Sequence, residues 1–380
     1  MKKLLLSIAI FFCAQLMVAQ TTINGSFVFE GVTRTYSFYV PATYTQGQAV
    51  PLILNLHGYT SNGFQQSIYS NFKPIADTAG FIIAHPDGTI HPISGQRFWS
   101  FDLLGATNVN DIGFLEALID TIAAHYTINP NRIYSTGMSN GAYMSYVLAC
   151  RSNRFAAVGS VTGSMSNAMY GTCNPARAIP VMEIHGTSDL VVPYAGDSLF
   201  KGIEDVVKFW AAKNGCDSTP SITSVANTSI ADNATVEHYV YGNGINGKSV
   251  ELFKVIGGGH TWPGSNIPLP SNGNTCLDFS ASKELWRFFS QYTLSSVAAV
   301  EAPTVADIKM YPNPTTGIVH FATNNMPITS VEITDMQGKL VATQRMPLVS
   351  EMNLDFLPSG LYVAKITGKN FCITKKLNIR

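Results

Sequence analysis

Charged residues are scarce in this chain of 380 residues, and neither sign prevails. Lysine and arginine together number 24, aspartate and glutamate together also number 24, and the formal net charge is zero. Without a basic run or stripe, the sequence lacks the electrostatic footprint of a nucleic-acid-binding protein. Long apolar runs are also missing after residue 20, where no stretch approaches the roughly 18 consecutive apolar residues of a membrane-spanning helix. We therefore expect a soluble mature protein with no membrane span and no nucleic-acid partner.

The motifs that mark metal or nucleotide cofactors are missing as well. The sequence has no HExxH, no CxxC pair and no clustered acidic loop, which argues against a metal site. No GxGxxG opens the first strand–helix unit, so a dinucleotide is not expected either. The sequence thus predicts chemistry carried by side chains alone, without a cofactor.

Cysteine is sparse, with six in the chain, of which Cys13 lies in the first twenty residues. The other five are Cys150, Cys173, Cys216, Cys276 and Cys372. An odd number leaves at least one thiol unpaired, and sequence alone does not fix the pairing. We favour Cys150–Cys173 and Cys216–Cys276, because Cys372 lies in what looks like a separate domain. The alternative is that all thiols are free.

The first twenty residues have a basic start, an apolar middle and a small-residue end, MKKLLLSIAIFFCAQLMVAQ. This pattern predicts a secretory signal peptide over residues 1–20, cut near Ala19 or Gln20. A membrane anchor is the alternative. The apolar core is short for a spanning helix, however, and no flanking charge cluster follows it. An exported protein meets oxidising conditions, in which disulfides persist.

Strands and helices alternate along most of the chain. Continuous apolar runs at 51–58 and 81–88 are typical of buried parallel strands. The spacing at 112–126 predicts a helix, and a strand at 132–136 is followed by a second helix at about 140–150. This alternation predicts an α/β fold, a parallel sheet with helices on both faces. Ligands of such sheets bind beyond the carboxyl ends of the strands, so the turns after strands are the candidate site.

Composition changes near residue 294. Residues 294–305 are mostly small and apolar with no clear period, and residues 306–380 contain short β-type runs separated by turn signals. We expect a small all-β domain, a sandwich. The predicted plan is a signal peptide at 1–20, an α/β domain at 21–293, a linker at 294–305 and the β domain at 306–380.

Residues 137–141, GMSNG, fit the pattern G-x-S-x-G between a predicted strand and a predicted helix. In that setting the glycines permit a sharp turn that presents the serine hydroxyl above the sheet, as in a serine nucleophile. Ser139 is therefore the candidate nucleophile. A plain tight turn is the alternative.

A serine hydroxyl needs a base, which is itself oriented by an acid, and in this fold class the chain order is serine, acid, histidine. His260 follows three glycines at the end of a predicted strand, and we expect these glycines to give its loop freedom. Asp189 lies in a loop after another strand, with Glu183 and Asp197 as rival acids. His185 is expected to be a packed residue beside Asp189.

Acyl transfer also needs hydrogen-bond donors for the developing oxyanion. The backbone N–H of Asn140, directly after the serine, is one candidate. The other is the N–H of Tyr59 in the early loop HGYTSNG, with Thr60 as its rival. Together these groups predict attack of Ser139 on an ester carbonyl and hydrolysis of an acyl-enzyme, with no metal.

Several aromatic residues lie near predicted strand ends and could stack on a phenolic acyl group or a sugar. We single out Trp99 and Trp262 as substrate contacts. Packing in the core is the alternative for each. The full set of such aromatic residues is Tyr59, Phe98, Trp99, Phe101 and Trp262.

Six stretches in order, LNLHGYTSNG, NDIGFLEALID, INPNRIYSTGMSNGAYMSYVLAC, RFAAVGSVTG, HGTSDLVVPY and GGGHTWPG, resemble a group of secreted esterases. The group comprises feruloyl esterases, acetylxylan esterases and polyhydroxybutyrate depolymerases, and the resemblance covers about residues 24–292. It implies an α/β-hydrolase fold with Ser139 as nucleophile, Asp189 as acid and His260 as base. It also implies Tyr59 and Asn140 as oxyanion donors, and it supports the two favoured disulfides.

The tail resembles a second family. YPNPTTG, DMQGKLV, LPSGLYVAKI and the basic end KKLNIR look like the C-terminal sorting domain of the type IX secretion system of Bacteroidetes. The resemblance implies export through the periplasm and outer membrane by that machinery, to the medium or the cell surface. A carbohydrate-binding sandwich is the alternative.

The sequence therefore predicts a secreted serine esterase that acts on feruloyl or acetyl esters of plant polysaccharide. A polyhydroxybutyrate depolymerase is the alternative within the same chemistry, and a serine peptidase would use the same three residues. A non-catalytic surface polymer-binding protein is the alternative of another class. The expected partners are an ester-bearing polymer or oligomer and the secretion machinery.

Overall fold

The computed structural model describes residues 20–100, 109–294, 308–323, 328–345, 351–368 and 371–380. The predicted signal peptide and linker lie almost entirely outside these ranges. The chain divides into two compact units, one ending at Ser295 and one beginning at Ser296. Each unit is described by itself.

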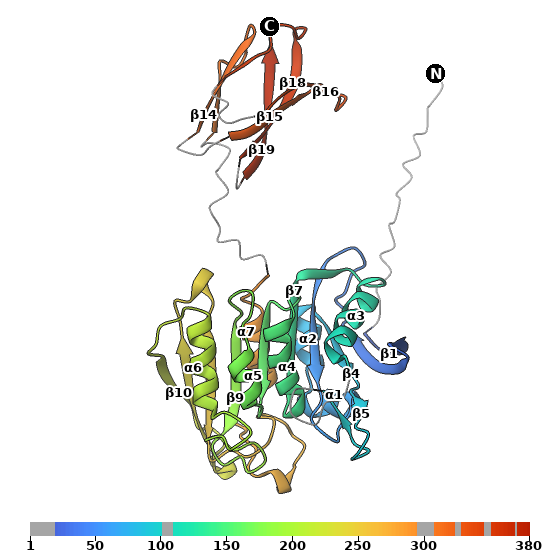
Figure 1. Cartoon of the computed structure of the whole chain (residues 1–380), viewed down its shortest axis with the longest axis vertical. Helices are drawn as coiled ribbons and strands as arrows, with labels where there is room; N and C mark the ends of the chain where they lie inside the picture. The colour runs from blue at the N-terminus through green and yellow to red at the C-terminus, as the bar shows by residue number, and fades with distance from the viewer. Residues whose placement is uncertain (1–19, 101–108, 295–307, 324–327, 346–350, 369–370) are drawn as a thin grey trace, which may run out of the picture. The chain divides into compact units, whose positions relative to one another are not determined.

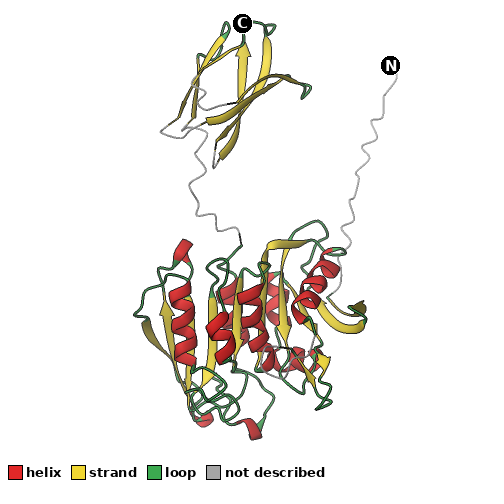
Figure 2. Cartoon of the chain, in the orientation of Figure 1, coloured by secondary structure: helices red, strands yellow, loops and turns green. Residues whose placement is uncertain are grey.

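The first unit is built on a ten-stranded sheet with the order β1-β2-β4-β3-β7-β8-β9-β12-β11-β10 (Figures 1 and 2). The six central strands, from β4 to β12 in that order, run parallel, and the pairs at both edges are antiparallel. The strands are β1 (Thr21–Phe29), β2 (Val32–Val40), β3 (Val50–Leu56), β4 (Ile82–Pro86), β7 (Ile128–Met138), β8 (Ala157–Val161), β9 (Val181–Gly186), β10 (Ser221–Val225), β11 (Thr235–Tyr241) and β12 (Val250–Ile256).

Helices cover both faces of this sheet, as the sequence predicted (Figure 1). Side chains of α3 (Asp111–Ala123), α4 (Asn140–Arg151), α5 (Asn167–Thr172) and α6 (Ile203–Lys213) join the core on one face. Side chains of α2 (Lys73–Ala79) and α7 (Ala281–Phe289) join the core on the other. Helix α1 (Gly63–Ser70) and the short β5–β6 pair (Thr89–Ile90 and Arg97–Phe98) lie in the connections around β4.

The central strands β3 and β4 are buried on both faces, which explains their mostly apolar sequences. In β3 every residue is buried, with Leu52 and Leu54 in the first core and Ile53 in the second. This division follows because successive side chains of a strand point to opposite faces. Helix α3 buries one stripe, which includes Phe114, Leu118 and Ile122, whereas α4 is buried along nearly its whole length. The carboxyl ends of the parallel strands therefore meet at one edge of a rigid two-faced core.

The second unit is all β. It contains the sheets β13-β14-β17 and β16-β15-β18-β19, whose inward side chains form a single core. Two sheets on one core make the sandwich that the short alternating runs predicted. The strands are β13 (Ile308–Tyr311), β14 (Ile318–Thr323), β15 (Ile328–Thr334), β16 (Leu340–Arg345), β17 (Glu351–Asn353), β18 (Gly360–Gly368) and β19 (Phe371–Ile379).

Within the ranges that the structure describes, no helix has both the length and the apolar character required to cross a bilayer.

Candidate active site

Ser139 occupies a sharp turn between β7 and α4. Its backbone has φ 53° and ψ −118°, a conformation that residues with a side chain rarely adopt. The glycines on either side are required by close approach: a Cβ on Gly137 would lie 2.6 Å from the carbonyl oxygen of Leu56, and a Cβ on Gly141 only 2.2 Å from it. The G-x-S-x-G spacing therefore reflects the packing of this turn against β3.

Hydrogen bonds fix the turn in place. The Ser139 N–H donates to the Val161 carbonyl of β8 at 2.9 Å. The buried side chain of Asn140 binds the backbone of Trp99 twice, accepting from its N–H at 2.6 Å and donating to its carbonyl at 3.1 Å. The indole of Trp99 in turn donates to the His57 carbonyl at 3.1 Å. The serine is thus held between β8 and the segment after β6.

His260 lies in the loop after β12, and its backbone is clamped to a neighbouring segment. Its N–H donates to the Asn272 carbonyl at 2.6 Å, and the Asn272 side chain donates back to the His260 carbonyl at 3.1 Å. A Cβ on Gly259 would lie 2.1 Å from that Asn272 oxygen. Gly259 thus permits close packing, whereas Gly257, at φ 79°, does use the conformational freedom that was expected of the glycines.

Asp189 follows β9 and contacts His260. Its Oδ2 lies 2.7 Å from His260 Nδ1, and its Oδ1 accepts the N–H groups of Val191 and Val192, both at 2.8 Å. Burial alone would raise the pKa of Asp189, but hydrogen bonds from His185 and His260 outweigh it and hold the pKa below its usual range. The carboxylate is therefore ionised and accepts a hydrogen from Nδ1, which leaves Nε2 of His260 to exchange protons.

The rival acids have other partners. Asp197 Oδ1 accepts the N–H groups of Leu199 and Phe200, at 2.7 and 2.8 Å, and so closes its own turn. Glu183 is buried inside β9 and binds His185 rather than His260. Of the three carboxylates, only Asp189 contacts the His260 ring.

Ser139 and His260 line the same pocket, which has a volume of about 470 Å³. Its apolar walls include Ile68, Ile267 and Leu269. The rest of the lining is Gly58, Tyr59, Thr60, Ser61, Gln65, Gln66, Tyr69, Met138 and Asn272. The serine and histidine, 121 positions apart in sequence, thus open onto one cavity at the carboxyl ends of the strands.

Two backbone N–H groups beside the pocket remain open as donors. The Thr60 N–H is already used, because it donates to the Arg97 carbonyl at 2.9 Å. Among the described ranges no such bond engages the Tyr59 N–H. Asn140 is the first residue of α4, and the first N–H groups of a helix have no acceptor within it. This favours the Tyr59 N–H over the Thr60 N–H as the second candidate oxyanion donor, beside the Asn140 N–H.

A buried histidine stiffens the loop that carries Tyr59. His57 Nδ1 lies 2.7 Å from the Gly58 carbonyl, and its Nε2 lies 2.9 Å from the Gly88 N–H. Since the Gly88 N–H can only donate, Nε2 accepts and Nδ1 carries the hydrogen. Burial lowers the pKa of His57 to about 4, which keeps this neutral form.

The two tryptophans chosen as substrate contacts do not line the pocket, so that expectation is corrected. Trp99 is 0% exposed and Trp262 is 1% exposed. The Trp262 indole donates to the Ser282 hydroxyl at 3.0 Å, while Trp99 supports the serine turn as described above. The aromatic side chains that do line the pocket are Tyr59 and Tyr69. Tyr69 was missed, although its place in the helix directly after β3 could have signalled it; Phe101 lies outside the described residues.

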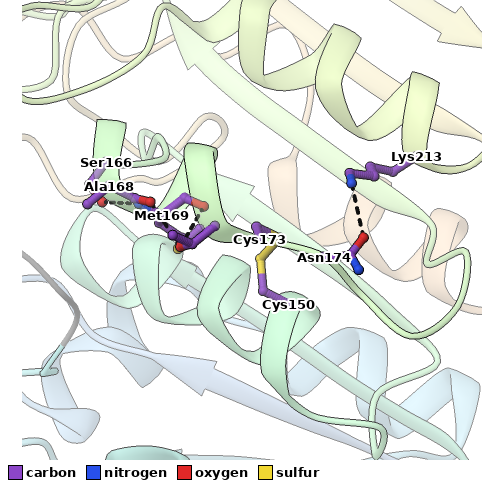
Figure 3. Close-up of a disulfide and its surroundings, with 8 residues drawn as sticks. Cys150, Ser166, Ala168, Met169, Cys173, Asn174 and Lys213 are labelled. Carbon is purple, nitrogen blue, oxygen red and sulfur yellow. Dashed lines mark hydrogen bonds between the residues drawn. A yellow bond between two sulfur atoms is a disulfide. The ribbon is translucent and has the colours of Figure 1, made fainter.

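The predicted disulfide between Cys150 and Cys173 is confirmed. It joins the end of α4 to the residue after α5, with the two Cα atoms 5.3 Å apart (Figure 3). Figure 3 also shows the neighbouring contact of Lys213 with Asn174, at 3.2 Å. The bond ties both helices together on the same face of the sheet.

The predicted pairing of Cys216 with Cys276 is wrong, because both thiols are free. Cys216 packs against the first core and lies 3.6 Å from the Lys248 carbonyl. Cys276 is buried in the second core, on the opposite face of the sheet. The sheet therefore separates the two sulfur atoms. The Cys372 side chain lies outside the described residues.

One group of side chains has the composition of a metal site, but its chemistry is unfavourable. The ligand atoms of Asp232, Cys276 and Asp278 lie within 4.8 Å of one another. The carboxylates already accept backbone hydrogens, from Leu277 and Thr228 among others. Burial raises the pKa of Cys276 to about 12, so the thiolate that a metal requires is strongly disfavoured.

Comparison with known proteins gives two family matches. Residues 34–206 match the esterase PHB depolymerase family, and residues 309–380 match the secretion system C-terminal sorting domain.

Three curated relatives illustrate the first match. Feruloyl esterase B of Piromyces equi is 29% identical over 232 residues, which cover 58% of this chain and 41% of the relative. A bifunctional acetylxylan esterase/xylanase of Neocallimastix patriciarum is 25% identical over 274 residues, covering 72% and 35%. A probable feruloyl esterase C of Aspergillus flavus is 30% identical over 203 residues, covering 52% and 67%.

This chain thus spans less than half the length of the first two relatives and two thirds of the third. The matches agree with the sheet topology and with the position of Ser139 at a strand-to-helix turn. The chain belongs to the family of the feruloyl esterases; it contains an esterase PHB depolymerase domain match at residues 34–206 and carries a secretion system C-terminal sorting domain.

Proposed function

We propose that this chain is a secreted serine esterase that hydrolyses carboxylic esters through an acyl-enzyme. One observation carries the proposal: Ser139 and His260 line a single pocket, and His260 is held from behind by the buried Asp189 carboxylate at 2.7 Å. A hydroxyl, an imidazole and a carboxylate in this order are the groups that acyl transfer requires.

In the proposed reaction the Ser139 hydroxyl attacks the ester carbonyl while Nε2 of His260 takes its proton. Asp189, bound to Nδ1, stabilises the imidazolium that forms. His260 then returns the proton to the departing alcohol, leaving the acyl group on Ser139. Water, activated by the same histidine, attacks this acyl-enzyme and releases the acid.

The N–H groups of Tyr59 and Asn140 would bind the carbonyl oxygen as it becomes negative. Backbone donors that are fixed before the reaction stabilise such an oxyanion without reorganising. Two contacts support this assignment. The bonds of His57 to Gly58 and Gly88 stiffen the first donor's loop, and the bonds of Asn140 to Trp99 anchor the second donor.

The proposed substrates are feruloyl or acetyl esters on plant polysaccharide. The names of the three relatives support this class. Polyester hydrolysis is the second candidate, favoured by the family match and by the apolar wall of Ile68, Ile267 and Leu269. A panel of methyl ferulate, acetylated xylan and hydroxybutyrate oligomers separates the candidates by kcat/KM.

Export by the type IX secretion machinery is proposed from the tail. The match at residues 309–380 supports it, because this domain is a sorting signal by its family description. Placing the enzyme outside the cell would bring it to polymers that cannot enter. Deletion of residues 309–380 should retain the protein inside the cell, which fractionation and immunoblotting would measure.

The catalytic assignment is tested by substitution in the full chain. Ser139→Ala and His260→Ala should each lower kcat on 4-nitrophenyl acetate by roughly 10³-fold or more, with the fold retained. Ser67→Ala, which changes a serine of α1 outside the pocket lining, should leave kcat nearly unchanged. Near-normal turnover in either active-site variant contradicts the assignment.

The other function classes give different results in the same assays. A peptidase would cleave a chromogenic peptide faster than the matching ester. A non-catalytic polymer-binding protein would show no hydrolysis in the wild type, yet Ser139→Ala would still bind the polymer in a pull-down assay.

A further inference from the structure

A row of buried polar contacts, some of them hydrogen bonds and one an ion pair, extends behind the Asp189–His260 pair. The Tyr146 hydroxyl of α4 donates to Glu183 Oε2 at 2.5 Å. Glu183 Oε1 lies 3.0 Å from Nδ1 of His185, and Nε2 of His185 lies 3.3 Å from Asp189 Oδ2. The side chains of Glu183, His185 and Asp189 are all 0% exposed. Asp189 is thus bound between two histidines, of which the proposed mechanism uses only His260.

The contacts of His185 restrict where its protons lie. Nε2 lies 2.9 Å from the Val192 carbonyl and close to the Asp189 carboxylate, and both groups can only accept. Nε2 must therefore carry a hydrogen. On the other side, Nδ1 and Glu183 Oε1 share one proton, so the pair is either an imidazolium and a carboxylate or a neutral imidazole and a carboxylic acid.

The surrounding charges favour the ionic form. Burial alone would lower the pKa of His185, but its hydrogen bonds and charge interactions with Asp189 and Glu183 outweigh burial and raise the pKa to about 9. Burial keeps the pKa of Glu183 above its usual value on balance, although the hydrogen bond and charge of His185 oppose this. A buried charge pair of this kind is retained only where its geometry and its further hydrogen bonds are good, as here.

Other titratable groups face the pair from each neighbouring element. The phenol of Tyr143 on α4 and that of Tyr194 after β9 remain neutral, because burial raises the pKa of both. Lys254 on β12 is the register neighbour of His185, but its ammonium pairs with Glu204 of α6 at 3.1 Å. The two carboxylates of Glu183 and Asp189 therefore dominate the surroundings of the His185 ring.

We propose that His185 is a positioning residue, held as an imidazolium by Glu183, which fixes the Asp189 carboxylate on the side opposite His260 and partly offsets its negative charge. The inference rests on the proposed function, because it assigns to His185 an effect on the His260 base. A positive charge on the far side of Asp189 partly cancels the carboxylate's attraction for a proton on His260. The pH dependence of kcat/KM would then depend on a residue outside the pocket.

His185→Gln tests this role directly. A glutamine amide can still donate to the Val192 carbonyl from about the position of Nε2, but it carries no charge. With the positive charge gone, the acid limb of kcat/KM should move to higher pH by about 0.5–1 unit. The looser carboxylate should also lower kcat roughly 10- to 100-fold, with little change in KM.

A control comes from another His–Glu contact of the same sheet, which is partly buried. His238 Nε2 lies 2.8 Å from Glu251 Oε2 in the β11–β12 pair, and neither residue lines the pocket. His238→Gln should leave the acid limb in place. A purely structural role for His185 predicts the same for His185→Gln: lower stability or kcat with an unchanged acid limb, and that result overturns the proposal.

The charge state is measured independently in the full-length wild type by NMR with ¹⁵N-labelled histidine. The His185 ring should be doubly protonated at pH 7 and should lose its proton only near pH 9, and Glu183→Gln should lower that titration point. A neutral His185 ring at pH 7 overturns the proposal even if His185→Gln fails to fold. The two levels are distinguishable: absence of wild-type hydrolysis refutes the proposed esterase function, whereas an unshifted acid limb in an active His185→Gln enzyme refutes only the role of His185.

Discussion

The backbone of Ser139 predicts an inverted order of stability for two inactive variants. At φ 53° and ψ −118° a side chain is strained, and residues in such sparsely populated regions cost about 1–3 kcal/mol. Ser139→Ala keeps the Cβ atom and hence the strain, whereas Ser139→Gly removes both. Neither variant has the hydroxyl, so the comparison measures folding free energy without a contribution from turnover.

The magnitude follows from two opposing contributions. Glycine in a regular position is less stable than alanine by roughly 0.5–1 kcal/mol, because it loses more backbone entropy on folding. Relief of the strain favours glycine by about 1–3 kcal/mol and outweighs this cost. We therefore expect the free energy of unfolding of Ser139→Gly to exceed that of Ser139→Ala by about 1 kcal/mol. In a domain of this size that difference corresponds to about 2–4 °C in Tm.

Urea denaturation and calorimetry of the full chain would measure the difference. The control is the same pair of substitutions at Ser67 inside α1, where the backbone is helical and alanine should be the more stable residue. If Ser139→Gly is less stable than Ser139→Ala by the margin seen at Ser67, the turn is not strained. The reasoning that connects the serine's exposure to a backbone cost would then fail.

Three further predictions concern stability. Reduction of Cys150–Cys173, which are 23 positions apart, should lower the unfolding free energy by about 3 kcal/mol in urea titrations, and equal midpoints with and without reductant would contradict this. Arg34→Ala should cost about 3–5 kcal/mol, because it leaves the buried Asp111 carboxylate, now 2.6 Å from the guanidinium, without its partner; a cost below about 1 kcal/mol would refute the buried pair. Because the folded pKa of His185, about 9, exceeds its ordinary value of 6.5, its imidazolium stabilises the fold fully below pH 6.5. That contribution, up to about 3 kcal/mol, should disappear as pH rises from 6.5 to 9, and His185→Gln should flatten the dependence of Tm on pH over this window.

The sheet and the residues of the proposed triad were accessible from sequence because both depend on local patterns. Mostly apolar runs indicated strands buried on both faces, and each candidate of the triad lies in the turn or loop that follows a predicted strand. Parallel strands end at one edge of the sheet, so Ser139, Asp189 and His260 had to lie near one another once the strands were placed. Their spacing along the chain carried no further information.

The incorrect predictions depended on the direction in which a side chain points, which the position of a residue along the chain does not reveal. Trp99 and Trp262 do lie after strands, but nothing in the sequence showed that their rings turn inward to donate hydrogen bonds to the His57 carbonyl and the Ser282 hydroxyl. The pairing of Cys216 with Cys276 failed for a related reason, because cysteine count does not say on which face of the sheet each thiol packs.

Part of the row of buried contacts beside Asp189, formed by Tyr146, Glu183 and His185, could have been predicted from the sequence. Glu183 and His185 are two apart in a strand whose residues are all buried, so alternation places them on the same face. Ionisable side chains are rarely buried without partners, because an unpaired buried charge is costly. VMEIHG therefore predicts a polar cluster on one face of β9, and Asp189, four residues beyond His185, is the nearest acid that a turn can bring back to it. The sequence pattern of β9 does not indicate the partner at the far end of this row, Tyr146. This residue belongs to α4, the helix that begins directly after Ser139. The same helix thus presents the nucleophile's neighbour at its first turn and, two turns on, the donor that holds Glu183. A change in the tilt of α4 would alter the proposed oxyanion donor and the support of Asp189 together.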